Sequence, residues 1–143
     1  MKRQKGFTLI EMMVGIGVML IVSAIATPVA STIFNQYEFT STIEQLAYEV
    51  ARTRMQAVAQ NVSMRVRITS TVYVRERSTD NVTWVQVDEP VALPDGITAA
   101  AGSAGSPSFN RNGLAAASTE ITVTRGSKHR TVHVSMIGRV TVT

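Results

Sequence analysis

The first thirty residues separate into a short basic segment and a long apolar one. Residues 1–6 carry three basic side chains, Lys2, Arg3 and Lys5, and residues 7–30 are mostly apolar. A helix needs about 20 residues to span the bilayer core. Basic residues before such a helix favour a cytoplasmic N-terminus, with the rest of the chain on the other side. The pattern predicts a transmembrane helix over residues 7–30.

Beyond residue 30 the apolar positions first follow a helical period. Ile43, Leu46 and Val50 recur at the spacing of one helix face, and residues 31–61 contain neither proline nor glycine. This stretch is therefore predicted to be an amphipathic helix that continues the transmembrane segment and ends close to Asn61.

After Asn61 the period changes to two, which is typical of strands. Residues 62–143 are predicted to form one β-rich domain, with residues 90–96 as a loop and residues 99–108 as a flexible segment rich in small residues. The expected fold class is α+β, in which a long N-terminal helix packs on an antiparallel sheet. The expected strands are 64–68, 72–77, 82–87, 120–124, 131–135 and 140–142, with a hairpin turn at Gly126-Ser127.

The basic start and apolar run also fit an ordinary secretory signal, which is cleaved after the apolar run. Residues 24–30 are rich in small residues, as that cleavage requires, so a released periplasmic domain is an alternative. Glu11 argues for retention, because an ionisable group within a membrane is costly and usually has a partner. Glu11 either is solvated at the headgroup boundary or meets a positive group within an assembly, such as the amino terminus of a neighbouring chain.

Residues 5–11, Lys-Gly-Phe-Thr-Leu-Ile-Glu, closely resemble the processing site of type IV prepilins. The resemblance implies that residues 1–6 are a leader, that a prepilin peptidase cleaves after Gly6, and that the new amino group of Phe7 is methylated. It also implies that Glu11 docks against Phe7 of a neighbouring subunit during filament assembly. Pro28 stands where many type IV pilins have a helix-breaking proline, and it is expected to kink the helix.

Gly15 and Gly17 have two interpretations of equal standing. With Pro28, they could let this part of the helix unwind inside a filament, because glycine weakens a helix. Alternatively, they are ordinary membrane-helix residues that permit close helix approach.

Two segments near the C-terminus resemble minor pseudopilins of the GspH/FimT family. They are residues 109–113, Phe-Asn-Arg-Asn-Gly, and residues 134–140, Val-Ser-Met-Ile-Gly-Arg-Val. The chain has no cysteine, so it lacks the paired cysteines of major pilins. The resemblance implies a subunit that initiates or caps a type II secretion pseudopilus or a type IV pilus. Expected partners are other pilin subunits, the peptidase, an inner-membrane assembly platform and membrane lipid, with the β-rich domain in the periplasm.

No group of residues in the sequence suggests catalysis. The two histidines, His129 and His133, would lie about 13 Å apart along one strand, which is too far for one metal ion. Asp88 and Glu89 lie in a loop without signs of an enclosed site, and no phosphate-binding loop is present. We expect no enzyme activity, no cofactor and no metal.

Arginines are frequent in residues 52–77, and basic residues are frequent in residues 111–139. They could form a solvated face whose carboxylate partners lie on neighbouring subunits. Alternatively, they could bind the phosphates of DNA in an uptake pilus. Arg139 is a candidate DNA contact through the resemblance to FimT-like proteins, while Lys128 and Arg130 are candidates from charge and proximity.

Overall fold

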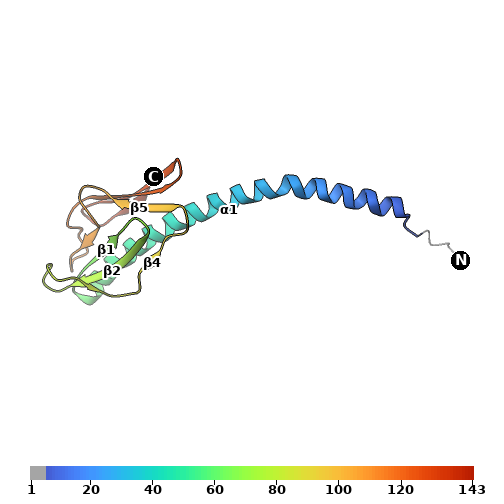
Figure 1. The fold of residues 1–143 in the computed structure, drawn as a ribbon. Helices are drawn as coiled ribbons and strands as arrows, with labels where there is room; N and C mark the ends of the chain where they lie inside the picture. The colour runs from blue at the N-terminus through green and yellow to red at the C-terminus, as the bar shows by residue number, and fades with distance from the viewer. Residues whose placement is uncertain (1–5) are drawn as a thin grey trace. The chain divides into compact units, whose positions relative to one another are not determined.

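The computed structural model describes residues 6–143, without the side chains of residues 26–29. The leader residues Lys2, Arg3 and Lys5 lie outside the described residues. The chain forms two compact units, one reaching to Tyr37 and the other spanning Glu38–Thr143. Helix α1, Leu9–Gln60, contributes its first part to one unit and its last part to the other (Figure 1).

The described part of the first unit is the apolar half of α1. Among the described residues, α1 is the one helix long and apolar enough to cross a membrane, and no residue of its apolar window is buried. The assigned helix is continuous through Pro28. The kink expected at Pro28 stays a prediction.

The second unit contains two antiparallel sheets (Figure 1). In the first sheet the order is β3-β2-β1-β6, with β4 also paired to β2, and in the second it is β5-β7-β8-β9. The strands are β1 (Ser63–Ile68), β2 (Val72–Ser78), β3 (Val85–Gln86), β4 (Val91–Ala92), β5 (Ile97–Ala101), β6 (Ser108–Phe109), β7 (Thr119–Arg125), β8 (Lys128–Val134) and β9 (Val140–Val142).

One face of α1 supplies the helical side of the core. Its buried residues recur every three or four positions, as an amphipathic helix requires, and both sheets contribute to the same cluster. This arrangement confirms the predicted α+β class, with a long N-terminal helix packed on antiparallel sheet. Prominent core residues are Phe39, Ile43, Leu46 and Val50 from the helix, Met64, Val66 and Phe109 from the first sheet, and Ile121, Val123, Val132 and Val134 from the second.

The end of α1 is defined by a left-handed residue. Asn61 has φ of 54°, a conformation that asparagine tolerates better than most residues. The amide of Val62 donates to the carbonyl of Ala57 at 3.2 Å, and that of Asn61 to Val58 at 3.3 Å. These two bonds form a Schellman motif, which satisfies the last helix carbonyls and turns the chain into β1.

Three segments differ from the sequence-based expectation. The strand expected at 82–87 shortens to β3, because Asp80 Oδ1 accepts the amides of Val82 and Thr83 at 2.9 and 2.8 Å and holds them in a turn. The loop expected at 90–96 contains the short strand β4. The segment expected to be flexible begins with the end of β5, which pairs with β7 from Ile97↔Arg125 to Ala101↔Ile121.

Candidate assembly site and basic surfaces

The N-terminal end of α1 is closed by a capping box formed by Thr8 and Glu11. Glu11 Oε2 accepts the Thr8 amide at 3.1 Å and the Thr8 hydroxyl at 3.0 Å, and the Glu11 amide donates to Thr8 Oγ1 at 3.3 Å. Such reciprocal bonds satisfy amides that the first helical turn leaves unpaired. Glu11 therefore has a role within its own chain, which the sequence analysis missed although Thr-x-x-Glu is a recognised signature.

The side chains around this cap are strongly exposed. Phe7 is 82% exposed, and Leu9 and Ile10 are also open. Both bonds that the Glu11 carboxylate accepts use Oε2, and its Oε1 has no hydrogen-bond partner among residues 6–143. Cleavage after Gly6, methylation of Phe7 and docking through Glu11 stay predictions.

The two C-terminal motifs converge on Arg54 of α1. Arg54 Nε donates to the carbonyl oxygen of Gly113 at 2.9 Å. Gly138 lies against the same groups, because a Cβ atom there would overlap the Arg54 side chain and come within 2.6 Å of the Gly113 oxygen. Both glycines have positive φ, 75° and 78°. We call this contact of Arg54, Gly113 and Gly138 the arginine clasp.

In the first basic region, two arginines share one carboxylate. Arg65 Nε and Arg67 Nε lie 2.6 and 2.7 Å from the two oxygens of Glu76. Burial acts to raise the pKa of Glu76, but the hydrogen bonds and charges of the two arginines outweigh it, and its pKa lies below the ordinary value. The Arg65 guanidinium also stacks over Trp84, 4.2 Å from the ring centroid. Trp84 thus packs against a side chain of β1, an inner strand of this sheet.

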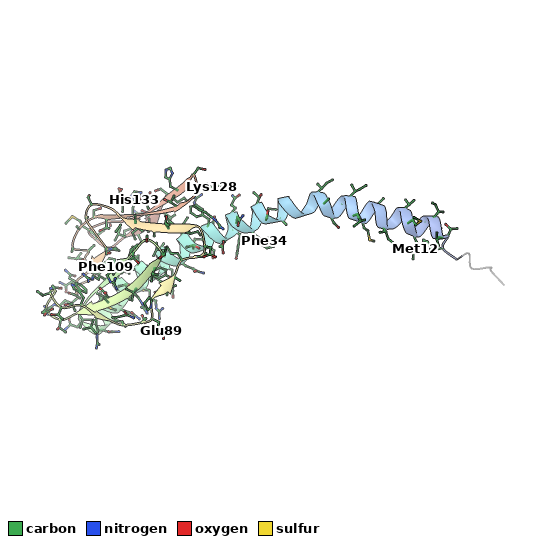
Figure 2. All side chains as sticks on the ribbon, viewed as in Figure 1. Met12, Phe34, Glu89, Phe109, Lys128 and His133 are labelled. Atoms are coloured by element: carbon green, nitrogen blue, oxygen red, sulfur yellow. The ribbon has the colours of Figure 1, made fainter. Side chains whose placement is uncertain are left out.

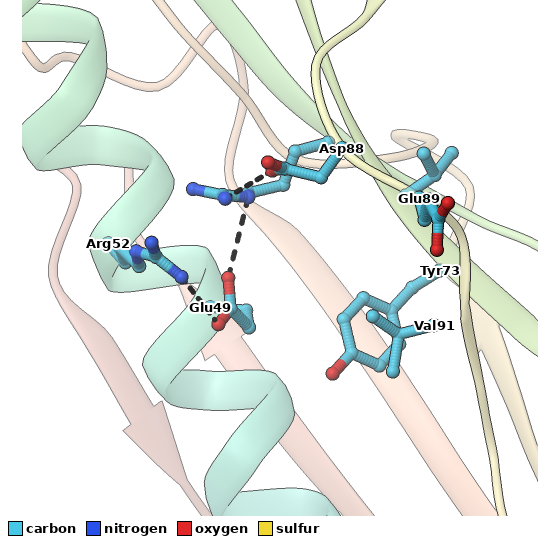
Figure 3. Close-up of a pocket in the computed structure, with 8 residues that line it drawn as sticks. Glu49, Arg52, Tyr73, Asp88, Glu89 and Val91 are labelled. Atoms are coloured by element: carbon cyan, nitrogen blue, oxygen red, sulfur yellow. Dashed lines mark hydrogen bonds and ion pairs between the residues drawn. The ribbon is translucent and has the colours of Figure 1, made fainter.

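Arg75 forms a second ionic network, beside a cavity of about 230 Å³ (Figure 3). Its Nε lies 3.5 Å from Glu49 Oε2, its Nη2 pairs with Asp88, and its Nη1 donates to Gln56 at 2.5 Å. Burial, and then the Glu49 charge, raises the pKa of the Tyr73 hydroxyl in the cavity wall.

These networks correct one sequence-based expectation. Arg75 and Glu76 are buried, each 7% exposed, so this region is not simply a solvated face. Carboxylates expected on neighbouring subunits lie within the same chain, on α1, on β2 and in the loop after β3. The arginines of residues 52–77 that carry these pairs are therefore structural.

The candidate DNA contacts lie at two ends of β8. Lys128 and Arg130 lie at its start and Arg139 in the turn after it; all three are exposed and have no ion-pair partner among the described residues. Because Val134 pairs with Val140, Arg139 lies roughly 17 Å from Arg130 and 23 Å from Lys128 along the strand. The fold does not gather the three into one cluster. Figure 2 shows Lys128 on the opposite side of the unit from Glu89.

The two histidines do not form a site. Both belong to β8, and His133 Nδ1 lies 3.3 Å from Glu120 Oε1. Within residues 6–143, no group of three acidic or histidine side chains is arranged to hold a metal ion.

Two protein-family models match this chain, one at its N-terminus and one over most of the remaining residues. Residues 1–27 match the prokaryotic N-terminal methylation motif, and residues 42–138 match the family of the type II transport protein GspH. No curated protein sequence matches the chain.

Solved structures that resemble the fold include a minor pilin and a minor pseudopilin. The type IV minor pilin FimU of Pseudomonas aeruginosa superposes with a TM-score of 0.64 at 16% identity, over 76% of this chain and 90% of that chain. The minor pseudopilin EpsH of Vibrio cholerae gives 0.62 at 9% identity, over 73% of this chain and 94% of that chain. At these identities the similarity concerns the fold alone.

Proposed function

Because the chain belongs to the family of the type II transport protein GspH, we propose that it helps to initiate or cap a short filament. Family membership makes it a minor pseudopilin or pilin of a type II secretion or type IV pilus system, and a structural protein that is not an enzyme. Other pilins and a prepilin peptidase are the partners that this membership implies.

In the proposed cycle, residues 7–30 anchor the chain in the inner membrane as a single span, with the β-rich unit in the periplasm. The peptidase removes residues 1–6 and methylates Phe7. An inner-membrane assembly platform then moves the subunit into the filament, where neighbouring helices replace lipid around α1.

The exposure of the apolar half of α1 supports this proposal most directly. Its Leu, Ile, Val and Met side chains between Leu9 and Ile25 are all more than half exposed. Covering one such side chain contributes about 1.5–3 kcal/mol, so this surface requires lipid or other helices. A single carboxylate, Glu11, lies at its start.

The capping bonds of Glu11 are compatible with the proposed docking role, because they occupy only one of its two carboxylate oxygens. Its Oε2 accepts the amide and the hydroxyl of Thr8, and its Oε1 bonds no other described residue. We expect Oε1 to receive the amino group of Phe7 from a neighbouring subunit. Such a pair within a packed helix bundle would be desolvated, and loss of one partner of a buried pair costs about 3–5 kcal/mol.

Glu11→Gln separates capping from docking. Glutamine serves at this position of a capping box but carries no charge, so the variant should be processed and inserted yet incorporated into filaments at least tenfold less. Thr8→Ala is the matched control, which weakens the cap and keeps the charge. Incorporation would be measured by immunoblotting sheared filaments.

Mass spectrometry of the mature chain should show a start at Phe7, whereas a start near Ser31 would support the released periplasmic domain. Normal incorporation of Glu11→Gln would refute the docking role.

The parent system is identified by deleting the gene and restoring it. Loss of exported enzymes that complementation restores would place the subunit in type II secretion. Unchanged secretion would instead favour a type IV pilus.

DNA binding in an uptake pilus is a second candidate, supported by the exposed Arg139 without an ion-pair partner among the described residues. The portion after the membrane segment should then bind duplex DNA less tightly as salt rises, and Arg139→Gln should weaken it further. Binding that ignores both changes would count against this function.

A further inference from the structure

The tip of the β7–β8 hairpin is a concentrated basic segment. Arg125, Lys128 and Arg130 lie within six consecutive residues, together with His129. Lys128 is the cross-strand neighbour of Arg125, and Arg130 pairs with Val123. Because residues two apart on a strand share a face, Lys128 and Arg130 point to the same side of the sheet.

This basic tip is held at the first residue of its unit. Arg125 Nη1 lies 2.9 Å from Oε2 of Glu38, and Glu38 begins the β-rich unit. The tip is therefore fixed to the place where the chain enters the unit.

Chain length keeps that place close to the membrane segment. Glu38 follows residue 30, the last residue of the proposed span, by eight positions. That stretch is about 12 Å long as a helix and at most about 28 Å in any conformation. This limit holds for every orientation of the two units.

Residues 31–51, which follow the span directly, show the opposite charge. They contain Glu38, Glu44 and Glu49 and neither lysine nor arginine. An exported flank without basic residues agrees with the rule that basic residues stay in the cytoplasm. In the folded unit, the pair between Arg125 and Glu38 brings the basic hairpin tip to this acidic segment, although the two are more than 85 positions apart in the sequence.

The acidic side chains near the hairpin tip do not pair with Lys128 or Arg130. Glu38 is occupied by Arg125, and Asp95 lies just before β5, which is separated from β8 by β7. Lys128 and Arg130 are exposed and have no ion-pair partner in the part of the chain that the structure describes.

We propose that Lys128 and Arg130 bind anionic phospholipid headgroups at the surface of the membrane that holds residues 7–30. This inference rests on the membrane anchoring in the proposed function. Two basic side chains near an anionic membrane surface together shift the ratio of docked to free units by about thirtyfold at physiological ionic strength. The contact holds the β-rich unit down on the bilayer before assembly.

The test uses the full chain in nanodiscs. Since the sequence has no cysteine, Ser127→Cys gives a single attachment point for a fluorophore at the hairpin tip. Nitroxide-labelled headgroups should quench it strongly in discs with 30% phosphatidylglycerol and weakly in pure phosphatidylcholine. Lys128→Glu with Arg130→Glu should reduce the quenching to the phosphatidylcholine level, as should 0.5 M salt.

Arg139→Glu is the control. Arg139 is also exposed and has no ion-pair partner among the described residues, but it lies beyond the other end of β8, so its replacement should leave quenching unchanged. If the chain floats with the discs, equal quenching in both lipids would overturn the proposal. Quenching that the double variant leaves unchanged would overturn it as well. A chain that does not float would contradict the membrane anchoring itself. A tip that responds to a short duplex DNA and not to phosphatidylglycerol would overturn lipid binding in favour of nucleic acid.

Discussion

The arginine clasp makes Gly138 sensitive to the smallest enlargement. In Gly138→Ala the new methyl group would overlap the Arg54 side chain and lie 2.6 Å from the Gly113 carbonyl oxygen. The oxygen is backbone and cannot rotate away. Either the turn before β9 shifts, or Arg54 leaves and its hydrogen bond to Gly113 is lost.

The expected loss has two parts. A residue other than glycine at positive φ costs roughly 1–2 kcal/mol, and the hydrogen bond from a charged donor contributes roughly 1.5–3 kcal/mol. Gly138→Ala should therefore lower the free energy of unfolding by about 3 kcal/mol. Gly105→Ala is the matched control, because Gly105 has φ of 77° with no atom within 4 Å of the added Cβ. It should lose only the first part, about 1 kcal/mol.

Urea unfolding of the chain from residue 31 onward measures both variants. Trp84 is the sole tryptophan and stacks on Arg65, so its fluorescence reports unfolding. Arg54→Met should cost less in the Gly138→Ala background than in the parent chain, since contacting residues are not additive. Equal losses in Gly138→Ala and Gly105→Ala would refute the clasp as a stabilising contact.

Two further predictions concern the ionic networks. The pKa of Glu76 is lowered in the folded state, so its contribution to stability is complete above its ordinary pKa of 4.5 and is lost as pH falls through the lower folded value. Glu76→Gln should therefore reduce the loss of unfolding free energy that urea titrations measure between pH 6 and pH 3. An unchanged pH dependence would exclude Glu76 as its source. Arg75→Met should cost roughly 3 kcal/mol because it leaves Glu49 and Asp88 without their buried cation. Arg52→Ala removes a pair whose arginine is 42% exposed, and it should cost under about 1 kcal/mol in the same assay.

The sequence allowed the helix and most strands to be predicted, because their patterns are local. The helical period around Ile43 and Leu46 and the alternation from Met64 to Ile68 each reflect burial on one face. β5 was missed because its alanines have low strand preference, and its structure depends on pairing with β7, twenty residues later.

The sequence motifs of the candidate site could be recognised, but the contacts between its residues could not be predicted from them. Glu11 was recognised as a charge at the start of an apolar run, but its bonds to Thr8 were overlooked. The arginines of residues 52–77 could be counted, but their partners could not be predicted. Glu76 meets Arg65 through the register of β1 and β2, whereas Glu49 and Asp88 reach Arg75 from α1 and from the loop after β3. The meeting of Gly113 and Gly138 at Arg54 depends on tertiary structure, which no local pattern encodes.

The arginine clasp also determines when the β-rich unit can finish folding. Its members come from positions 54, 113 and 138, so it closes only after nearly the whole chain is available. Contacts of such wide sequence separation form late, because loop closure must precede them. Residues 38–60 of α1 can therefore form their helix before the clasp that joins Arg54 to the two C-terminal turns is complete. A weakened clasp should chiefly speed unfolding instead of slowing the first steps of folding.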